Sequence, residues 1–551
     1  MCPILYRAKW LCKMPAIPDQ TRADQFLVRE ENWARRVLTR ASLMWWTASL
    51  SGRARDYKRM ESADRAVNRH YSRSAAYRRL VRLANAHELD ALTRRRLDRL
   101  GLAYRSKQAP VEILDRITRA EAQMQETYSI FRAQFDGHSA TDNELEDVLR
   151  ASTDSGRVRA AWEARKQIGP VVADDLRQLA HLRNAAARAV GFPDYWHAQL
   201  LLDELDPGRL AETLAQVEAE TRQPFQAMKA DLDQHLAKRF GVDARDLRPW
   251  HYGDPFFQET PEVFAPPADP LYAEHDVVGL AAETYRQLGF RNIDAILARS
   301  DLYPRQGKNQ HAYAVDIDRE GDVRTFLNVE PNARWMGTLL HELGHTIYQD
   351  GIDRSELPYD LRDDPQGFLN EGFAMFCEQP STTPAWLSDV VGLPETTAHQ
   401  LAPRLASQEA ASLLAFVRWC LTIVHFERAF YADPDRDLNR LWWDLEERYQ
   451  LISRPTGRAA PDWATKVHVA TAPVYYQKYL LGRLFSAQLT RKLDADLGGW
   501  WPGRPKSGEF IKRELFMPGA RYTWPELVKR VTGQPLGVEA LATAVAWPRA
   551  A

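Results

Sequence analysis

The sequence predicts a mainly α-helical protein with one small antiparallel β-sheet. Long segments rich in Ala, Leu, Arg and Glu place apolar residues at helical spacing, and glycine and proline fall mostly between these segments. Residues 311–329 instead alternate apolar and polar side chains around a Glu-Gly pair, which is the pattern of a β-hairpin. At 551 residues the chain can bury a large core. We expect a single large two-lobed domain at residues 20–551, after an N-terminal tail at residues 1–19.

The predicted elements follow one another in a regular order. In the first half of the chain, helical spacing extends over residues 22–50, 57–105, 110–135, 143–165, 170–190 and 208–240. Residues 248–270 interrupt it with aromatic residues and prolines, and predict a long ordered loop of the kind that often carries function. After the loop come a helix near 274–289, the 311–329 hairpin, and further helical segments at 333–450, 472–495 and 524–545.

Charge and composition are those of an ordinary globular protein. The net charge is −1, with 27% charged and 45% hydrophobic residues, so no global field favours nucleic acid as a partner. Residues 51–100 carry fourteen Lys and Arg against six Asp and Glu, which leaves a local nucleic-acid patch open. Leucines at helical spacing in the same segment favour another interpretation, in which the arginines form the solvated face of helices.

Cysteine usage and the N-terminal sequence bear on the compartment. Four cysteines in 551 residues do not form a disulfide framework, and Cys377 and Cys420 stand among apolar residues as buried thiols would. The first residues have no apolar core of signal-peptide length, and no stretch approaches 18 uncharged apolar residues. We therefore expect a cytoplasmic protein without a membrane partner.

The segment HELGH at residues 341–345 predicts a metal site. On a helix, Met336, Leu340, Leu343 and Ile347 would share one buried face, while His341 and His345 would point to the opposite side. Imidazoles at i and i+4 can bind one Zn²⁺ ion, and Glu342 beside them could act as general base toward a zinc-bound water. A solvated helix surface would not explain the glutamate.

A third protein ligand is expected on a following helix. Glu371 stands as a lone acid among phenylalanines, leucine and methionine, where a carboxylate is costly unless it is paired or bound to a metal. Asp364 suits the N-cap of that helix, with Pro365 in the first turn. Asp350, Asp353 and Glu356 are weaker alternatives, because they lie in a loop close to the motif.

Four ordered motifs together resemble the gluzincin peptidases, and specifically the angiotensin-converting-enzyme family of zinc dipeptidyl carboxypeptidases. They are HAYAVDID at 311–318, HELGH at 341–345, GFLNE at 367–371, and the segment from LWWDLEERYQ to YYQKYLLGRLFSAQ at 441–488. The resemblance is close over about residues 300–490 and general over the N-terminal half. It implies a large helical metallopeptidase fold with a small antiparallel sheet beside a central substrate groove.

The resemblance also implies a role for each matching residue. His341, His345 and Glu371 would hold Zn²⁺, and Glu342 would be the general base. His311 and Ala312 would bond the substrate backbone as an added strand. The remaining roles are a clamp for the substrate's C-terminal carboxylate, formed by Lys466, Tyr476 and Gln258, and hydrogen bonds to the scissile carbonyl from His468 and Tyr479.

This sequence departs from the family pattern at several points. One extra residue precedes Glu371, and another separates Lys466 from the tyrosine pair, so the register between Tyr475 and Tyr476 stays open. Met375 occupies the position of a family aspartate, and Glu378 is the candidate to support a zinc histidine in its place.

Three functions are weighed on these observations. The first is a zinc-dependent peptidase that releases C-terminal dipeptides from short peptides. The second is an oligopeptidase of the related thimet type, which would cut internal bonds, and the clamp residues disfavour it. The third is a non-catalytic helical scaffold for peptides or RNA, which is disfavoured because every catalytic group is present.

Overall fold

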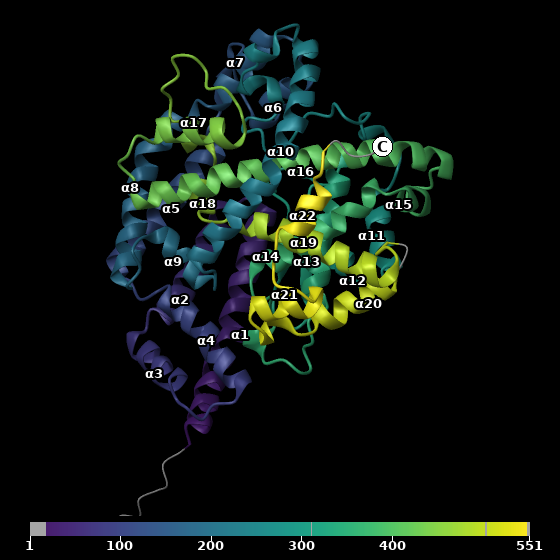
Figure 1. The fold of residues 1–551 in the computed structure, drawn as a ribbon. Coiled ribbons are helices and arrows are strands. Elements are labelled where there is room, and N and C mark those ends of the chain that lie inside the picture. The colour runs from purple at the N-terminus through teal and green to yellow at the C-terminus, as the bar shows by residue number, and fades with distance from the viewer. Residues whose placement is uncertain (1–17, 310, 502–503, 548–551) are drawn as a thin grey trace, which may run out of the picture.

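The computed structural model describes residues 18–309, 311–501 and 504–547, and most of them lie in α-helices (Figure 1). The mainly α-helical fold class is confirmed. Helices of the first half are α1 (Asp19–Ser51), α2 (Ala54–Tyr71), α3 (Ser74–Ala84), α4 (Ala91–Arg105), α5 (Val111–Ile130), α6 (Asp142–Ala151), α7 (Ser155–Arg165), α8 (Ile168–Ala189), α9 (Tyr195–Leu202) and α10 (Pro207–Phe240). The predicted tail at residues 1–19 lies outside the described residues, apart from Pro18 and Asp19, where α1 begins.

The second half of the chain is also mostly helical. Its helices are α11 (Val277–Gln287), α12 (Ile293–Arg299), α13 (Ala333–Asp350), α14 (Gly367–Glu378), α15 (Pro384–Asp389), α16 (Glu395–Ala432), α17 (Leu438–Tyr449), α18 (His468–Thr471), α19 (Tyr476–Leu497), α20 (Lys506–Ile511), α21 (Trp524–Thr532) and α22 (Glu539–Ala544). The predicted loop at 248–270 contains only the short 3₁₀ turns η2 (Pro249–Tyr252) and the start of η3 (Asp269–Leu271). It is therefore an ordered loop, as expected.

Several predicted helices are shorter than their patterns. The segment 57–105 forms three helices, and Asp90 starts the last of them, α4, by accepting a hydrogen bond from the Thr93 N–H (2.8 Å). The segment 143–165 breaks in the same way before α7, where Asp154 accepts from the N–H groups of Gly156 and Arg157. Each cap satisfies N–H groups that a helix start leaves free, and thereby fixes a start that periodicity alone does not reveal.

Within the described residues, the sheet content is two antiparallel hairpins. The predicted one is confirmed as β3 (Tyr313–Asp316) paired with β4 (Val323–Phe326), with Tyr313 opposite Phe326. A second hairpin, β1 (Ala133–Phe135) with β2 (His138–Ala140), replaces the end of the helix predicted at 110–135. Its turn residues, Asp136 and Gly137, both have positive φ (49° and 80°). An Asp-Gly pair of this kind is a strong hairpin signal, and the helical pattern before it hid the turn.

One continuous apolar core extends from α5 to α22, and α16 crosses the molecule through it (Figure 1). In the part of the chain that the structure describes, α16 is the one helix long and apolar enough to span a membrane. Within its apolar window 72% is buried inside the protein, which is typical of a central core helix. Cys377 and Cys420 are buried free thiols in this core, as predicted.

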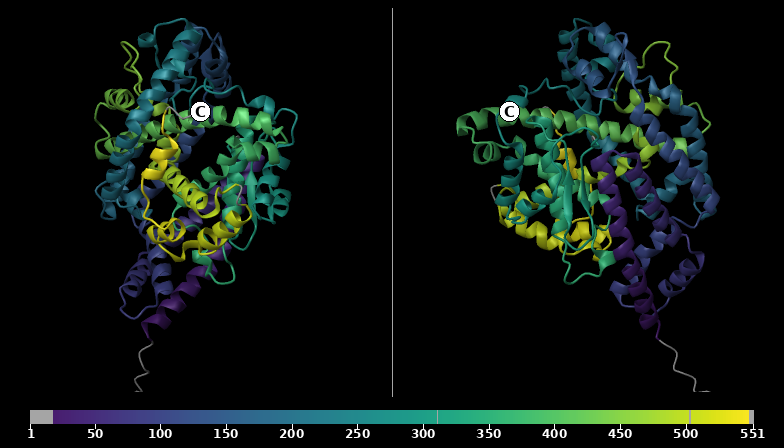
Figure 2. Two further views of the ribbon diagram at one scale, coloured as in Figure 1. Left: turned by 45° about the vertical axis from the view of Figure 1, so that its right-hand side comes forward. Right: turned by 180° about the vertical axis from the view of Figure 1, so that it is seen from behind.

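The N-terminal helices have a small core of their own. Leu80, Leu83 and Leu97 pack with Phe26 and Tyr104, which confirms the leucine stripes expected in this segment. Helix α1 then runs beside the β3–β4 hairpin, where Trp46 packs edge-on against Phe326 at a centroid distance of 5.7 Å (Figure 2, right). The N-terminal helices are thus joined to the region of the predicted substrate-binding strand.

Candidate metallopeptidase site

Helix α13 presents the HELGH segment as predicted. Asn332 caps the helix by accepting from the Trp335 N–H (2.9 Å), and Met336, Leu340, Leu343 and Ile347 are all buried on one face. The imidazoles of His341 and His345 lie on the other side, half-buried, with their Nε2 atoms 3.1 Å apart.

Helix α14 brings Glu371 to the two histidines. Its carboxylate Oε2 lies 3.6 Å from Nε2 of His341 and 3.7 Å from Nε2 of His345. This approach needs small residues between the helices: a Cβ on Gly344 would lie 2.9 Å from Cα of Ala374 in α14. On the far side, a Cβ on Gly372 would lie 2.7 Å from the carbonyl oxygen of Gly482 in α19. Close packing of α13, α14 and α19 therefore sets the three side chains together.

The expected cap of α14 is wrong. Gln366, not Asp364, is the N-cap, and its side-chain oxygen accepts from the Phe368 N–H (2.7 Å). Asp364 instead accepts from Nδ2 of Asn370 (3.2 Å), and Asn370 Oδ1 pairs with Nδ1 of His345 (2.8 Å). Asn370 thus orients one histidine, a role that its sequence position beside Glu371 did not reveal.

The other histidine is held by a charged pair. Glu378 Oε1 lies 2.6 Å from Nδ1 of His341, as anticipated for the residue replacing the missing aspartate. Arg483 from α19 donates to the other oxygen of Glu378 at 3.3 Å. Carboxylate and amide oxygens only accept, so both Nδ1 atoms donate and both Nε2 lone pairs face each other.

This arrangement fits a cation. Two Nε2 acceptors 3.1 Å apart repel one another unless a positive charge lies between them, and Glu371 Oε2 is buried without a hydrogen-bond partner. Burial opposes charge on His341, yet the nearby carboxylates of Glu371 and Glu378 raise its pKa well above the usual value, so the cluster attracts positive charge. The three ligand atoms lie within 4.8 Å of one another. Two imidazoles and one carboxylate are a ligand set suited to catalytic Zn²⁺.

Glu342 adjoins this cluster on the next helical position. Its side chain is half-buried, and burial raises the pKa of its carboxyl above the ordinary value. A carboxylate with a raised pKa is a better proton acceptor than an exposed one, which suits general base chemistry.

Lys466 and Gln258 meet although 208 residues separate them. The Lys466 ammonium donates to Oε1 of Gln258 at 2.8 Å, and Asp254 orients Gln258 by accepting from its backbone N–H at 3.0 Å. Lys466 is only 7% exposed, with aromatic rings of Phe256, Trp419 and Tyr476 at 4.9, 5.4 and 5.7 Å from Nζ. Burial lowers the pKa of Lys466 to about 8, partly offset by Asp254. A buried ammonium of this kind favours an anionic ligand.

Tyr475 and Tyr476 point to different parts of the site. Tyr476 packs beside Lys466 and His468, with its ring centroid 5.1 Å from that of His468. Tyr475 points elsewhere: its hydroxyl donates to Glu371 Oε1 at 2.8 Å. Tyr479 stacks edge-on against both, at centroid distances of 5.0 and 5.4 Å. The Tyr475 contact with the carboxylate is a feature that the sequence did not indicate.

His468 is placed as a neutral hydrogen-bond donor. Burial and the nearby charges of Lys466 and His311 lower its pKa to about 3, and its Nδ1 is buried without a partner. His311 itself is exposed, and Ala312 precedes β3. Among the described strands β3 pairs only with β4, so its other edge offers backbone groups to an extended peptide.

A strained residue sets the tyrosine positions. Val474 has a φ of +56°, which is rare for a β-branched residue and costs about 1–3 kcal/mol. Its N–H donates to Glu427 Oε1 (2.8 Å), and its carbonyl accepts from Gln477 Nε2 (2.6 Å). These two bonds hold the chain in the left-handed region directly before Tyr475, where the sequence has its extra residue.

We expect the hydrogen bond from Val474 to Glu427 to make the stability of the protein depend on pH. Burial raises the pKa of Glu427 to about 8, so the folded protein keeps a proton that the unfolded chain releases above about pH 4.5. The free energy of unfolding should therefore fall between pH 5 and 8, by up to about 1.4 kcal/mol per pH unit from this group. Glu427→Gln, which keeps the acceptor without the proton, should reduce that fall.

Glu427→Leu should cost about 1–3 kcal/mol at pH 6, because the Val474 N–H loses its partner. Chemical denaturation of both variants at pH 5, 6 and 8 measures these effects. Equal stability of the Gln and Leu variants would show that Glu427 does not hold Val474.

A comparison with known proteins identifies the family of this chain. A search of curated proteins found no significant match. The family profile described as angiotensin-converting enzyme, peptidase M2, matches residues 17–249 and 271–536, which is most of the chain. The chain therefore belongs to the angiotensin-converting enzyme family of metallopeptidases, whose substrates are peptides.

Proposed function

We propose that the protein releases dipeptides from the free C-termini of short peptides. The contact between Lys466 and Gln258 supports this proposal, because it joins a buried ammonium to an amide, and such a pair can bind a terminal carboxylate. An enzyme that cuts internal bonds has no use for such a clamp. A carboxylate held at a fixed place determines which bond reaches the catalytic residues.

The chain's own residues supply the proton transfers. Glu342 takes a proton from the attacking water as the new C–O bond forms, and gives it to the amine as the C–N bond breaks. His468 and Tyr479 donate hydrogen bonds to the carbonyl oxygen as negative charge develops on it. Bound by His341, His345 and Glu371, Zn²⁺ would act as a Lewis acid on the scissile carbonyl.

The substrate backbone is aligned by the free edge of β3. His311 and Ala312, immediately before that strand, would pair with the peptide main chain. Tyr476 would support Lys466 at the carboxylate. Main-chain pairing gives little side-chain selectivity, so we expect the enzyme to accept many sequences of suitable length.

Amidation of the substrate tests the clamp. Blocking the terminal carboxylate should lower kcat/KM by roughly 30- to 150-fold, or about 2–3 kcal/mol, because Lys466 then loses a charge-assisted partner. Lys466→Met should cost a similar factor with free-acid peptides, and little more with amides. Steady-state kinetics on matched acid and amide peptides gives both ratios.

Lys478→Met is a suitable control, since Lys478 pairs with Asp203 and not with Gln258. It should preserve the difference between acids and amides. Equal cleavage of acids and amides by the unmodified enzyme, at internal bonds, would instead support the thimet-type alternative.

A further inference from the structure

The two oxygens of the Glu371 carboxylate have different surroundings. Oε2 lies 3.6 Å from Nε2 of His341 and 3.7 Å from Nε2 of His345, and it is buried without a hydrogen bond to the described residues. Oε1 instead accepts a hydrogen bond from the hydroxyl of Tyr475 at 2.8 Å. One oxygen is therefore available to a cation between the histidines, and the other is already bonded.

Helix α19 brings the tyrosine hydroxyl to α14. Tyr475 is the residue directly before this helix, and Tyr479 and Gly482 follow it at helical spacing, so the three lie along one face. A Cβ on Gly482 would lie 3.3 Å from Cβ of Glu371 and 3.1 Å from the backbone nitrogen of Gly372. The two helices can approach so closely because position 482 has no side chain. This approach puts the first residue of the face within reach of the carboxylate.

The Tyr475 ring is held by its neighbours. The preceding residue, Val474, is fixed in the left-handed region by its hydrogen bond to Glu427. The ring of Tyr479 packs edge-on against that of Tyr475 at a centroid distance of 5.0 Å. On another side, the ammonium of Lys478 lies 5.0 Å from the Tyr475 ring centroid, where the π-electrons attract it.

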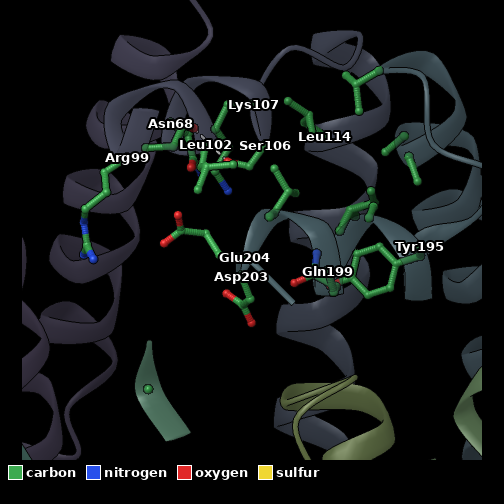
Figure 3. Close-up of a pocket in the computed structure, with 18 of the residues that line it drawn as sticks. Asn68, Arg99, Leu102, Ser106, Lys107, Leu114, Tyr195, Gln199, Asp203 and Glu204 are labelled. Atoms are coloured by element: carbon green, nitrogen blue, oxygen red, sulfur yellow. Dashed lines mark hydrogen bonds between the residues drawn. The ribbon is translucent and has the colours of Figure 1, made fainter. Parts of the chain in front are cut away.

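Lys478 has a carboxylate partner of its own. It forms an ion pair of 2.7 Å with Asp203, which follows α9 and lines a cavity of about 780 Å³ between α2, α4, α5, α8 and α9. Figure 3 shows Asp203 beside Glu204 among the residues of this lining. Because the lysine is paired there, the group that bonds Oε1 of Glu371 is the hydroxyl of Tyr475.

This hydrogen bond matters because a carboxylate can bind zinc through one oxygen or through both. A catalytic zinc site has three protein ligands and keeps a further position open for water. A second oxygen from Glu371 would take up such a position. A buried carboxylate oxygen without a partner is costly, so without the tyrosine hydroxyl Oε1 would gain by turning to the metal.

We propose that Tyr475 is a positioning residue that makes Glu371 bind zinc through one oxygen only. By holding Oε1 it leaves Oε2 as the ligand, and the position that a second oxygen would fill stays open for the water that Glu342 deprotonates. The proposal rests on the proposed function, because it takes zinc to be bound by His341, His345 and Glu371.

The Tyr475→Phe variant tests this mode of binding. We expect the visible absorption of Co²⁺, bound in place of zinc, to weaken, because a second oxygen raises the coordination number and four-coordinate Co²⁺ absorbs most strongly. X-ray absorption of the zinc-loaded variant should show an additional oxygen neighbour. We expect kcat to fall by about 10- to 100-fold, the usual cost of losing the outer partner of a ligand. Zinc affinity should fall by less than this factor, because the second oxygen compensates.

Tyr104→Phe is the matched control. Tyr104 also donates to a glutamate, Glu30, at 2.9 Å, but it belongs to the small core of the N-terminal helices. Its loss should leave the Co²⁺ spectrum and kcat unchanged.

Two unnatural residues at position 475 separate the hydrogen bond from packing. 4-Aminophenylalanine keeps a donor in the same place and should restore the original Co²⁺ spectrum. 4-Methylphenylalanine has a similar size without a donor and should behave like phenylalanine.

An unchanged Co²⁺ spectrum in Tyr475→Phe would overturn the proposal, and so would a changed spectrum that 4-aminophenylalanine does not restore. Complete loss of metal from Tyr475→Phe would also contradict it, because the tyrosine would then be needed for binding itself. In each of these cases the proposed function stands. If the unmodified protein binds neither Co²⁺ nor Zn²⁺, the zinc site has failed, and the proposed function with it.

Discussion

Replacing Glu342 by alanine is expected to lower kcat by at least about 10²-fold while the protein keeps one zinc ion per chain. The Glu342 side chain adjoins the His341, His345 and Glu371 cluster but is not one of its three ligand groups. Its removal therefore takes away the proton acceptor and leaves the metal ligands in place. Metal analysis and kinetics on the same preparation give both quantities.

Glu330→Ala is the matched control, because Glu330 is an exposed acid just before α13. It should keep both activity and zinc. An active Glu342→Ala protein with full zinc would contradict the hydrolytic mechanism, since no other general base is assigned to the water.

Glu371→Gln is expected to weaken zinc binding by at least about 100-fold. Loss of an outer partner of a ligand typically costs 10- to 100-fold in metal affinity, so loss of a ligand's charge should cost no less. Tyr475 can still donate to the amide oxygen, so the helices around the site should keep their packing. Far-ultraviolet circular dichroism should accordingly be unchanged.

The Glu378→Gln variant tests the residue that supports a zinc ligand separately from the ligand itself. Because Glu378 acts on the metal only through His341 Nδ1, its loss should cost less than that of Glu371. Competition with a chelator of known affinity measures both variants. Retention of stoichiometric zinc by Glu371→Gln under mild chelation would show that the third ligand lies elsewhere.

Much of the site was predictable because its signals are local. The spacing of apolar residues around HELGH shows which face of its helix is buried, and Glu371 stands out as the one acid in the apolar stretch 367–377. The hairpin at 311–329 is a period-two pattern around a turn. Such features depend on neighbours in sequence, and the structure places them as the patterns indicate.

What could not be predicted depends on packing between distant segments. The support of Glu378 by Arg483 and of His345 by Asn370 exists only because α14 packs between α13 and α19. The tyrosine register depends on the left-handed Val474, which Glu427 holds from another helix. Periodicity could not show the helix breaks near Asp90 and Asp154 either, since caps compete with helix continuation through single hydrogen bonds.

Mass spectrometry of the products from one free-acid peptide of about ten residues tests the central claim most directly. If Lys466 and Gln258 fix the C-terminus, the first products are the C-terminal dipeptide and the peptide shortened by two residues, followed by further dipeptides in turn. Zinc-dependent release of internal fragments, with no dipeptide among the early products, would contradict the account.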